Sequence, residues 1–161
     1  MPYETIGDVI KSGFLYVSGR DFKHRPILIL NVRKIVDVEY PIEVIGQATA
    51  FFCDFVVKKL LVPGKIENWI MLIDLKDVGM TSLPVKKVQS IVGLTQKHFG
   101  GRLFRQFLVN MGFMMRKSSS IFLNFVDDIT QQKISVHNEK TFQVELLKLI
   151  APATLEQKYG G

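Results

Sequence analysis

Cysteine is nearly absent from this sequence, since Cys53 is the only one among its 161 residues. A lone cysteine excludes an internal disulfide, which is typical of proteins in a reducing compartment. Because it stands among Phe51, Phe52 and Phe55, we expect a buried and unreactive thiol. The sequence therefore favours a cytoplasmic location.

Long apolar runs are also missing. A membrane-spanning helix needs about 20 consecutive apolar residues, whereas the longest dense stretch, residues 51–62, is interrupted by Asp54, Lys58 and Lys59. The first residues, Met-Pro-Tyr-Glu, contain neither the basic region nor the apolar region of a secretory signal. We therefore expect a soluble protein that meets membranes only at their surface.

Catalytic and metal-binding motifs are lacking as well. There is no Gly-x-Ser-x-Gly elbow and no glycine-rich phosphate loop after a strand. His24, His98 and His137 are far apart and lack metal-ligand spacing, so we expect no metal. Asp74 ends an apolar run, where α/β folds place ligand or catalytic groups, but no partner is visible. We expect it to bind nearby backbone N–H groups, and the sequence predicts no enzyme and no cofactor besides a bound ligand.

Positive charge is present in moderate excess, with 21 Lys and Arg against 15 Asp and Glu and a net charge of +6. The basic residues form scattered pairs such as Lys58-Lys59 and Lys86-Lys87. Nucleic-acid-binding proteins usually concentrate such residues in one helix or stripe, so we expect no nucleic-acid partner. The scattered charge favours an ordinary solvated surface, and attraction to an anionic membrane surface is the main alternative.

Strand-like and helix-like patterns alternate along the chain. Strands are predicted at residues 14–17, 27–32, 69–74, 103–110 and 133–136, and helices at 41–61, 82–99 and 139–150. The polar turn between the first two strands predicts an antiparallel edge, and the later alternation predicts parallel strands with right-handed crossovers. We expect an α/β fold with a mixed, mostly parallel sheet in one domain over 1–161, residues 1–13 being an N-terminal extension.

Residues 111–126 do not fit an ordinary amphipathic helix, because both ends are apolar on nearly all sides around a polar middle. Such a helix is either buried in a core or covers an apolar ligand. The periodicity favours a core helix. Met114 and Met115 favour a ligand, because flexible thioethers repack easily, and both readings stay open.

Four segments, in order, resemble the CRAL-TRIO lipid-binding domain. They are Gly-Arg-Asp-Phe-Lys-His-Arg-Pro at 19–26, the strand region 67–79, Phe-Val-Asp-Asp-Ile-Thr-Gln-Gln-Lys-Ile at 125–134, and the terminal region 145–161 with its Tyr-Gly-Gly end. The resemblance spans residues 14–161 and lacks the family's N-terminal helical lobe. It implies a sheet floor, helical walls that enclose a lipid, and a helix that gates the pocket.

The resemblance also implies three groups of site residues. The lipid pocket would be lined by Leu28, Leu30, Trp69, Met71, Ile73, Gln106 and Leu108. The lipid head group would meet Thr130, Lys133 and Arg102, and the gate would comprise Phe113, Met114, Ile121, Phe122, Phe125 and Val126. For Thr130 and Lys133 the alternative is a turn cap and a solvated amine.

Several residues depart from the family pattern. Trp69 and Met71 are large where binders of choline phospholipids have small hydroxyl residues, and Gly101 replaces a glutamate of the phosphatidylinositol binders. These changes favour a more hydrophobic ligand, such as a sterol-like or isoprenoid molecule. His24 and Asp77 stand where the family often has glycine, so we expect altered turns there.

The sequence thus predicts a protein that binds one lipid, a phosphatidylinositol-like phospholipid or another hydrophobic lipid, and transfers it between membranes through a gated apolar pocket. Its partners would be the lipid and, transiently, an anionic membrane surface. The alternative is a protein-interaction module associated with small-GTPase or membrane-trafficking regulation.

Overall fold

A five-stranded sheet forms the centre of the molecule. The computed structural model describes residues 3–37, 40–113, 117, 120, 124, 127–137 and 141–161. The strands are β1 (Leu15–Arg20), β2 (Pro26–Asn31), β3 (Trp69–Asp74), β4 (Leu103–Val109) and β5 (Ile134–Val136). They lie side by side in sequence order, with β1 antiparallel to β2 and all other neighbours parallel. The predicted α/β class with an antiparallel edge is confirmed.

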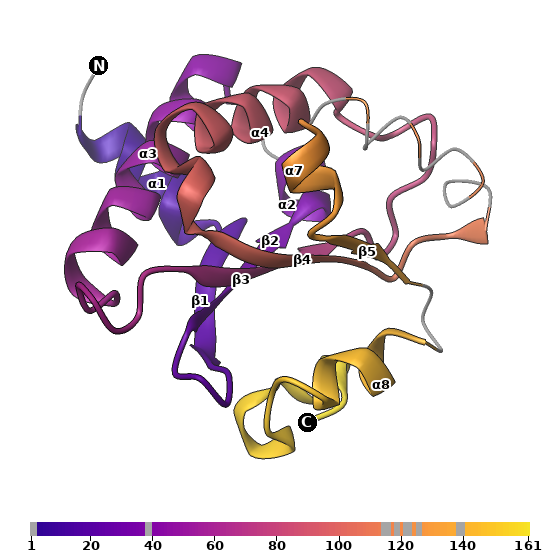
Figure 1. Ribbon diagram of the computed structural model, residues 1–161. Helices are drawn as coiled ribbons and strands as arrows, with labels where there is room; N and C mark the ends of the chain where they lie inside the picture. The colour runs from indigo at the N-terminus through magenta and orange to yellow at the C-terminus, as the bar shows by residue number, and fades with distance from the viewer. Residues whose placement is uncertain are drawn as a thin grey trace.

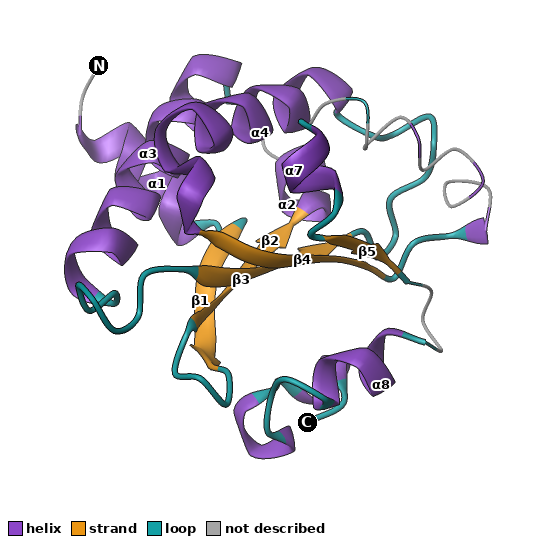
Figure 2. Ribbon diagram, viewed as in Figure 1, coloured by secondary structure: helices purple, strands orange, loops and turns teal. Residues whose placement is uncertain are grey.

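Helices cover both faces of this sheet (Figures 1 and 2). On one face lie α1 (Tyr3–Lys11), α2 (Val32–Asp37), α3 (Ile42–Lys59), α4 (Val85–Phe99) and the short α7 (Asp128–Gln131). On the other face lies α8 (Phe142–Leu147), followed by the 3-10 turns η2 (Pro152–Thr154) and η3 (Gln157–Tyr159).

The topology explains why the helices divide in this way. Each of the parallel strands β3, β4 and β5 lies beside the strand that precedes it in the chain, always on the same side. Right-handed crossovers then place the described connecting helices on the same face of the sheet. The opposite face is left for the chain after β5. Strand β3 is therefore covered from both sides and is buried at all six positions, as its unbroken apolar run predicted.

Each face of the sheet has its own hydrophobic core. Leu28, Leu30 and Ile73 point toward the α1–α4 face, whereas Ile70 and Tyr159 belong to the core on the α8 face. Alternate side chains of a strand point to opposite faces, so two helical layers are stabilised by one set of strands.

Three of the described α-helices were not predicted, namely α1, α2 and the four-residue α7. Helix α1 lies within the predicted N-terminal extension and has Val9 fully buried in the core against α3. Helix α2 begins at Val32, which the prediction had assigned to the end of a strand. Its six residues make fewer than two turns, too few for helical periodicity to be visible in the sequence.

The turns at His24 and Asp77 differ from expectation in an informative way. Both residues have positive φ angles, 61° and 59°, in the left-handed region that favours glycine. The altered geometry that we predicted is therefore wrong: the backbone keeps a glycine-like conformation despite the side chains. Each such residue costs roughly 1 kcal/mol, and at His24 a hydrogen bond from its N–H to the carbonyl of Asp21, 2.9 Å long, offsets that cost.

Candidate functional site

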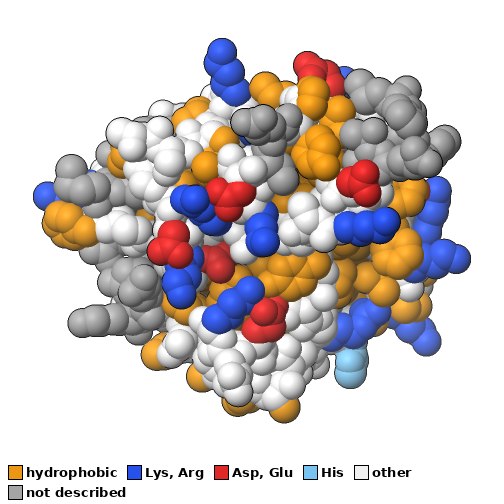
Figure 3. All heavy atoms as spheres, turned by 180° about the vertical axis from the view of Figure 1, so that it is seen from behind, with side chains coloured by type: hydrophobic (Ala, Val, Ile, Leu, Met, Phe, Trp, Pro, Cys, Tyr) orange, Lys and Arg blue, Asp and Glu red, His pale blue; other side chains and the backbone are white. Residues whose placement is uncertain are grey.

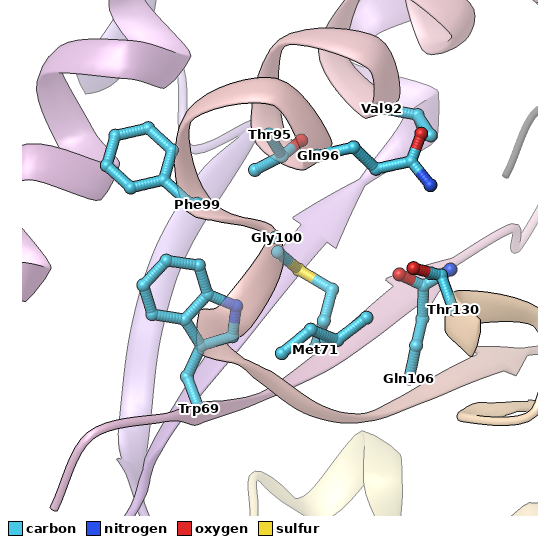
Figure 4. A pocket seen from close by; sticks show the side chains of 10 residues that line it. Trp69, Met71, Val92, Thr95, Gln96, Phe99, Gly100, Gln106 and Thr130 are labelled. Atoms are coloured by element: carbon cyan, nitrogen blue, oxygen red, sulfur yellow. The ribbon is translucent and has the colours of Figure 1, made fainter. Parts of the chain in front are cut away.

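A small cavity lies between α4 and the sheet (Figure 4). Its volume is about 50 Å³. The residues that line it are Trp69, Met71, Val92, Thr95, Gln96, Phe99, Gly100, Leu103, Gln106 and Thr130. The rings of Trp69 and Phe99 form one apolar end, with centroids 6.1 Å apart, and amide and hydroxyl groups form the other end.

The floor of the cavity is set by the strand register. Met71 of β3 lies directly opposite Gln106 of β4, so both side chains emerge on the same face. Trp69 precedes Met71 by two positions and shares this face, where it is only 1% exposed. All three were predicted as pocket residues, and all three line the cavity.

The other four predicted pocket residues lie on this face of the sheet but away from the cavity. Leu28, Leu30, Ile73 and Leu108 are between 0% and 4% exposed and pack in the hydrophobic core. Alternation along a strand determines the face on which a side chain lies, but not which positions of that face the overlying helices fill.

The roof comes from α4, and the sequence analysis did not identify it. Val92, Thr95, Gln96 and Phe99 have the three- and four-residue spacing of one helical face. Two of them are polar where a purely structural helix would continue its apolar stripe. The apolar face of this helix changes from Val88 and Val92 to the polar Thr95 and Gln96, and this change in the sequence indicates a partly polar cavity beneath the end of the helix.

Asp127 organises the polar end of the cavity. As the N-cap of α7 it accepts hydrogen bonds from the backbone N–H of Thr130 at 2.9 Å and from its hydroxyl at 2.8 Å. It also accepts one from the Gln96 amide at 2.9 Å. The two bonds from Thr130 lower the pKa of the Asp127 carboxyl below its usual value. Asp127 thereby joins α4 and α7.

The three predicted head-group residues do not meet at one site. Thr130 lines the cavity and is buried. The ammonium of Lys133 instead donates to the Leu103 carbonyl at 2.9 Å. The guanidinium of Arg102 donates to the Glu67 carbonyl at 3.0 Å and borders a different hollow, near α3.

Most of the predicted gate lies outside the described residues, namely Met114, Ile121, Phe122, Phe125 and Val126. Phe113 is described and is 60% exposed. The ammonium of Lys117 lies 4.7 Å from the centroid of its ring, within the range of a cation–π contact.

Asp74 is engaged in structure rather than exposed for chemistry. One carboxylate oxygen accepts from the Lys76 backbone N–H at 3.0 Å and from the Asn110 amide at 2.8 Å. The other accepts from the Tyr159 hydroxyl at 2.7 Å. Burial, followed by this bond to Asp74, raises the pKa of the Tyr159 hydroxyl above its usual range, so it remains a donor. The prediction that Asp74 binds backbone N–H groups is confirmed for Lys76.

The surface matches the scattered charge of the sequence. On the face shown in Figure 3, Lys and Arg side chains are separated by apolar and acidic ones and form no continuous stripe. Among the helices that the structure describes, none is long and apolar enough to cross a bilayer. The described ranges also contain no group of three or more His, Cys, Asp or Glu side chains placed to hold a metal ion.

Taken together, fold and site define an α/β domain in which helices on one face of a mostly parallel sheet roof a largely apolar cavity. The model of the CRAL/TRIO domain family matches residues 10–161, and the chain belongs to this family. The recognition made from the sequence motifs is thereby confirmed.

A solved structure adds support for the fold. The crystal structure of Sfh5 is similar with a TM-score of 0.65 at 14% sequence identity. The similarity covers 83% of this chain and 50% of that one, so the chain spans about half the length of Sfh5. Comparison with curated proteins gives no match.

Proposed function

We propose that this protein binds a single lipid between α4 and the sheet and transfers it between membranes. The observation that carries the proposal is the cavity itself, with an aromatic end at Trp69 and Phe99 and a polar end at Gln106 and Thr130. An apolar hollow with a few convergent polar groups is typical of small-molecule sites. Membership in the CRAL/TRIO domain family supports the same function.

The polar groups at the cavity favour an uncharged lipid. None of the described residues that line it carries a charge. The Thr130 hydroxyl donates a hydrogen bond to the Asp127 carboxylate, so only its lone pairs remain to accept a hydrogen bond from a ligand. The Gln106 amide can both donate and accept. A hydroxyl or carbonyl group, as on a sterol or an isoprenoid alcohol, suits this pair better than a phosphate does.

The cavity must enlarge before a lipid can enter. Ligand pockets usually measure about 300–1,000 Å³, whereas this cavity measures about 50 Å³. We propose that residues 113–126 act as the gate, and that the basic surface brings the protein to anionic membranes in the cytoplasm.

The test is lipid exchange from donor to acceptor vesicles, with a fluorescent sterol, a labelled isoprenoid alcohol and labelled phosphatidylinositol compared in parallel. Gln106→Leu keeps the side-chain size but removes the hydrogen-bonding amide. We expect uptake of the neutral lipid to fall roughly tenfold, the equivalent of about one lost hydrogen bond.

The matched variants are Lys133→Gln and Arg102→Gln, which remove the cations implied for a phosphate head group. We expect both to exchange the neutral lipid at rates close to the unmodified protein. If they abolish phosphatidylinositol exchange while Gln106→Leu has no effect, the ligand is the phospholipid. Failure of the unmodified protein to take up any of the three lipids, with none copurifying in native mass spectrometry, would refute lipid binding.

A further inference from the structure

A second, larger hollow lies at the amino-terminal edge of the sheet. It measures about 550 Å³ and is bordered by the β1–β2 turn, the segment before β3, the start of β4 and the residues after α8. Phe104 and Leu149 on its wall pack against the core of the α8 face. The sheet therefore separates this groove, which we call the basic groove, from the cavity beneath α4.

Its framework is a fixed ion pair in the β1–β2 turn. Asp21 accepts from the backbone N–H groups of Lys23 at 2.9 Å and Arg25 at 2.8 Å. It also binds the Arg25 guanidinium at 2.6 and 2.7 Å. The guanidinium then lies 3.3 Å from the centroid of the Phe104 ring. The turn is thus preorganised, with little conformational entropy left to lose on binding.

The charge of the groove is strongly one-sided. Lys23, Arg25, Lys65 and Lys148 line it, and Asp21 is the only acid among its described lining residues. The Asp21 carboxylate is already saturated by the turn. No acidic side chain in the described part of the chain forms a salt bridge with Lys23 or Lys65, whereas Lys148 pairs with an exposed glutamate.

An exposed aromatic ring adds an apolar anchor. Phe22 is 59% exposed, yet its backbone is held by a 2.9 Å hydrogen bond from its N–H to the Leu149 carbonyl. The same residue borders a neighbouring hollow of about 330 Å³, which Arg20 and His24 also line. Phe22 therefore stands as a ridge between two concave surfaces, both flanked by cations.

From this arrangement we propose that the basic groove binds an acidic segment of a partner protein, with acidic side chains at Lys23 and Lys65 and an apolar side chain beside Phe22. A concave surface on both sides of the ring suits a peptide chain, which can enter it, better than a flat bilayer. Complementary charge at the rim would mainly speed association and select the partner.

The experiment is selection of a displayed random-peptide library on the full chain, followed by fluorescence-anisotropy titration of the enriched peptides. Binding is compared in Lys23→Glu/Lys65→Glu and in Lys34→Glu/Lys86→Glu. The four lysines are all exposed, so neither double variant disturbs the core, and both change the net charge equally. Phe22→Ser tests the apolar anchor.

We expect enrichment of peptides that combine acidic with aromatic or large aliphatic residues. Their affinity should fall roughly tenfold or more in the groove variant and by less than about twofold in the control. Enrichment without acidic residues, or equal binding by the two double variants, overturns the proposal. If no peptide is selected, and phosphatidylserine vesicles bind in a manner that depends on Lys23 and Lys65, the groove is a membrane contact instead. We expect lipid binding in the cavity, measured by native mass spectrometry, to be unchanged in all of these variants, because none of the substituted residues lines it.

Discussion

The sharpest test of the fold concerns the hydrogen bond between Tyr159 and Asp74, which fixes the C-terminal segment to the sheet. The phenol is fully buried, the carboxylate is 4% exposed, and their oxygens are 2.7 Å apart. A hydrogen bond to a charged group contributes about 1.5–3 kcal/mol. Tyr159→Phe removes only the hydroxyl and leaves one buried carboxylate oxygen without this donor.

We therefore expect Tyr159→Phe to lower the free energy of unfolding by about 2 kcal/mol. For a chain of this length that corresponds to a fall in Tm of roughly 4–8 °C. Urea denaturation followed by circular dichroism measures the free energy, and a thermal scan measures Tm. The slope of the urea dependence should stay constant, because the surface exposed on unfolding is unchanged.

Tyr16→Phe provides the matched control, since the same atom is removed from another tyrosine that contacts the C-terminal segment. The Tyr16 hydroxyl donates to Glu156 at 2.7 Å, but this pair is only partly buried, and water can replace the lost donor. We expect a loss below about 1 kcal/mol. Equal losses for the two variants, or a loss below about 0.5 kcal/mol for Tyr159→Phe, would show that the buried carboxylate does not fix this segment.

Three further predictions concern single groups. Burial raises the pKa of the Cys53 thiol to about 12, so a maleimide should leave it unmodified at pH 8 and label it rapidly in denaturant. The pKa of the Asp127 carboxyl is lowered in the fold. The carboxylate therefore stabilises the fold above its unfolded-state pKa, and this contribution is lost as pH falls below about 4. The NMR amide shift of Thr130 should report the loss, and Asp127→Asn should remove this titration. The Arg25 guanidinium contacts Asp21, whose side chain is 1% exposed, through two nitrogen atoms. A lysine cannot form this paired contact, so Arg25→Lys should lower the free energy of unfolding, measured by urea denaturation, by about 2 kcal/mol.

The fold was largely predictable because its long elements carry strong local patterns. The stretch 69–74 is continuously apolar and is buried on both faces, and α3 lies within two residues of its predicted bounds. Local patterns failed where an element is short or where packing decides. Helix α2 has six residues, and the burial of Val9 depends on contact with α3, which no local window of sequence contains.

The site was only half predictable, for a related reason. The family resemblance named Trp69, Met71 and Gln106 as pocket residues, and all three side chains line the cavity. Which floor positions remain uncovered depends on where α4 crosses the sheet, and that is a long-range property. Helical spacing nevertheless contained the clue for the roof, because Thr95 and Gln96 interrupt an apolar stripe that begins at Val88.

The position of the cavity is unusual for a parallel sheet, and the C-terminal segment explains it. Ligands of open α/β sheets usually bind at the carboxyl ends of the strands, where β3 presents Asp74. Here the Asp74 carboxylate is bound by the hydroxyl of Tyr159, which is 85 residues away in sequence. The cavity opens instead over the amino-terminal halves of β3 and β4, beside Trp69 and Leu103, the first residues of these strands. If the proposed function is correct, the chain uses one end of its strands for stability and the other for a ligand. Variants of Asp74 should then alter unfolding, and variants of Gln106 should alter lipid exchange.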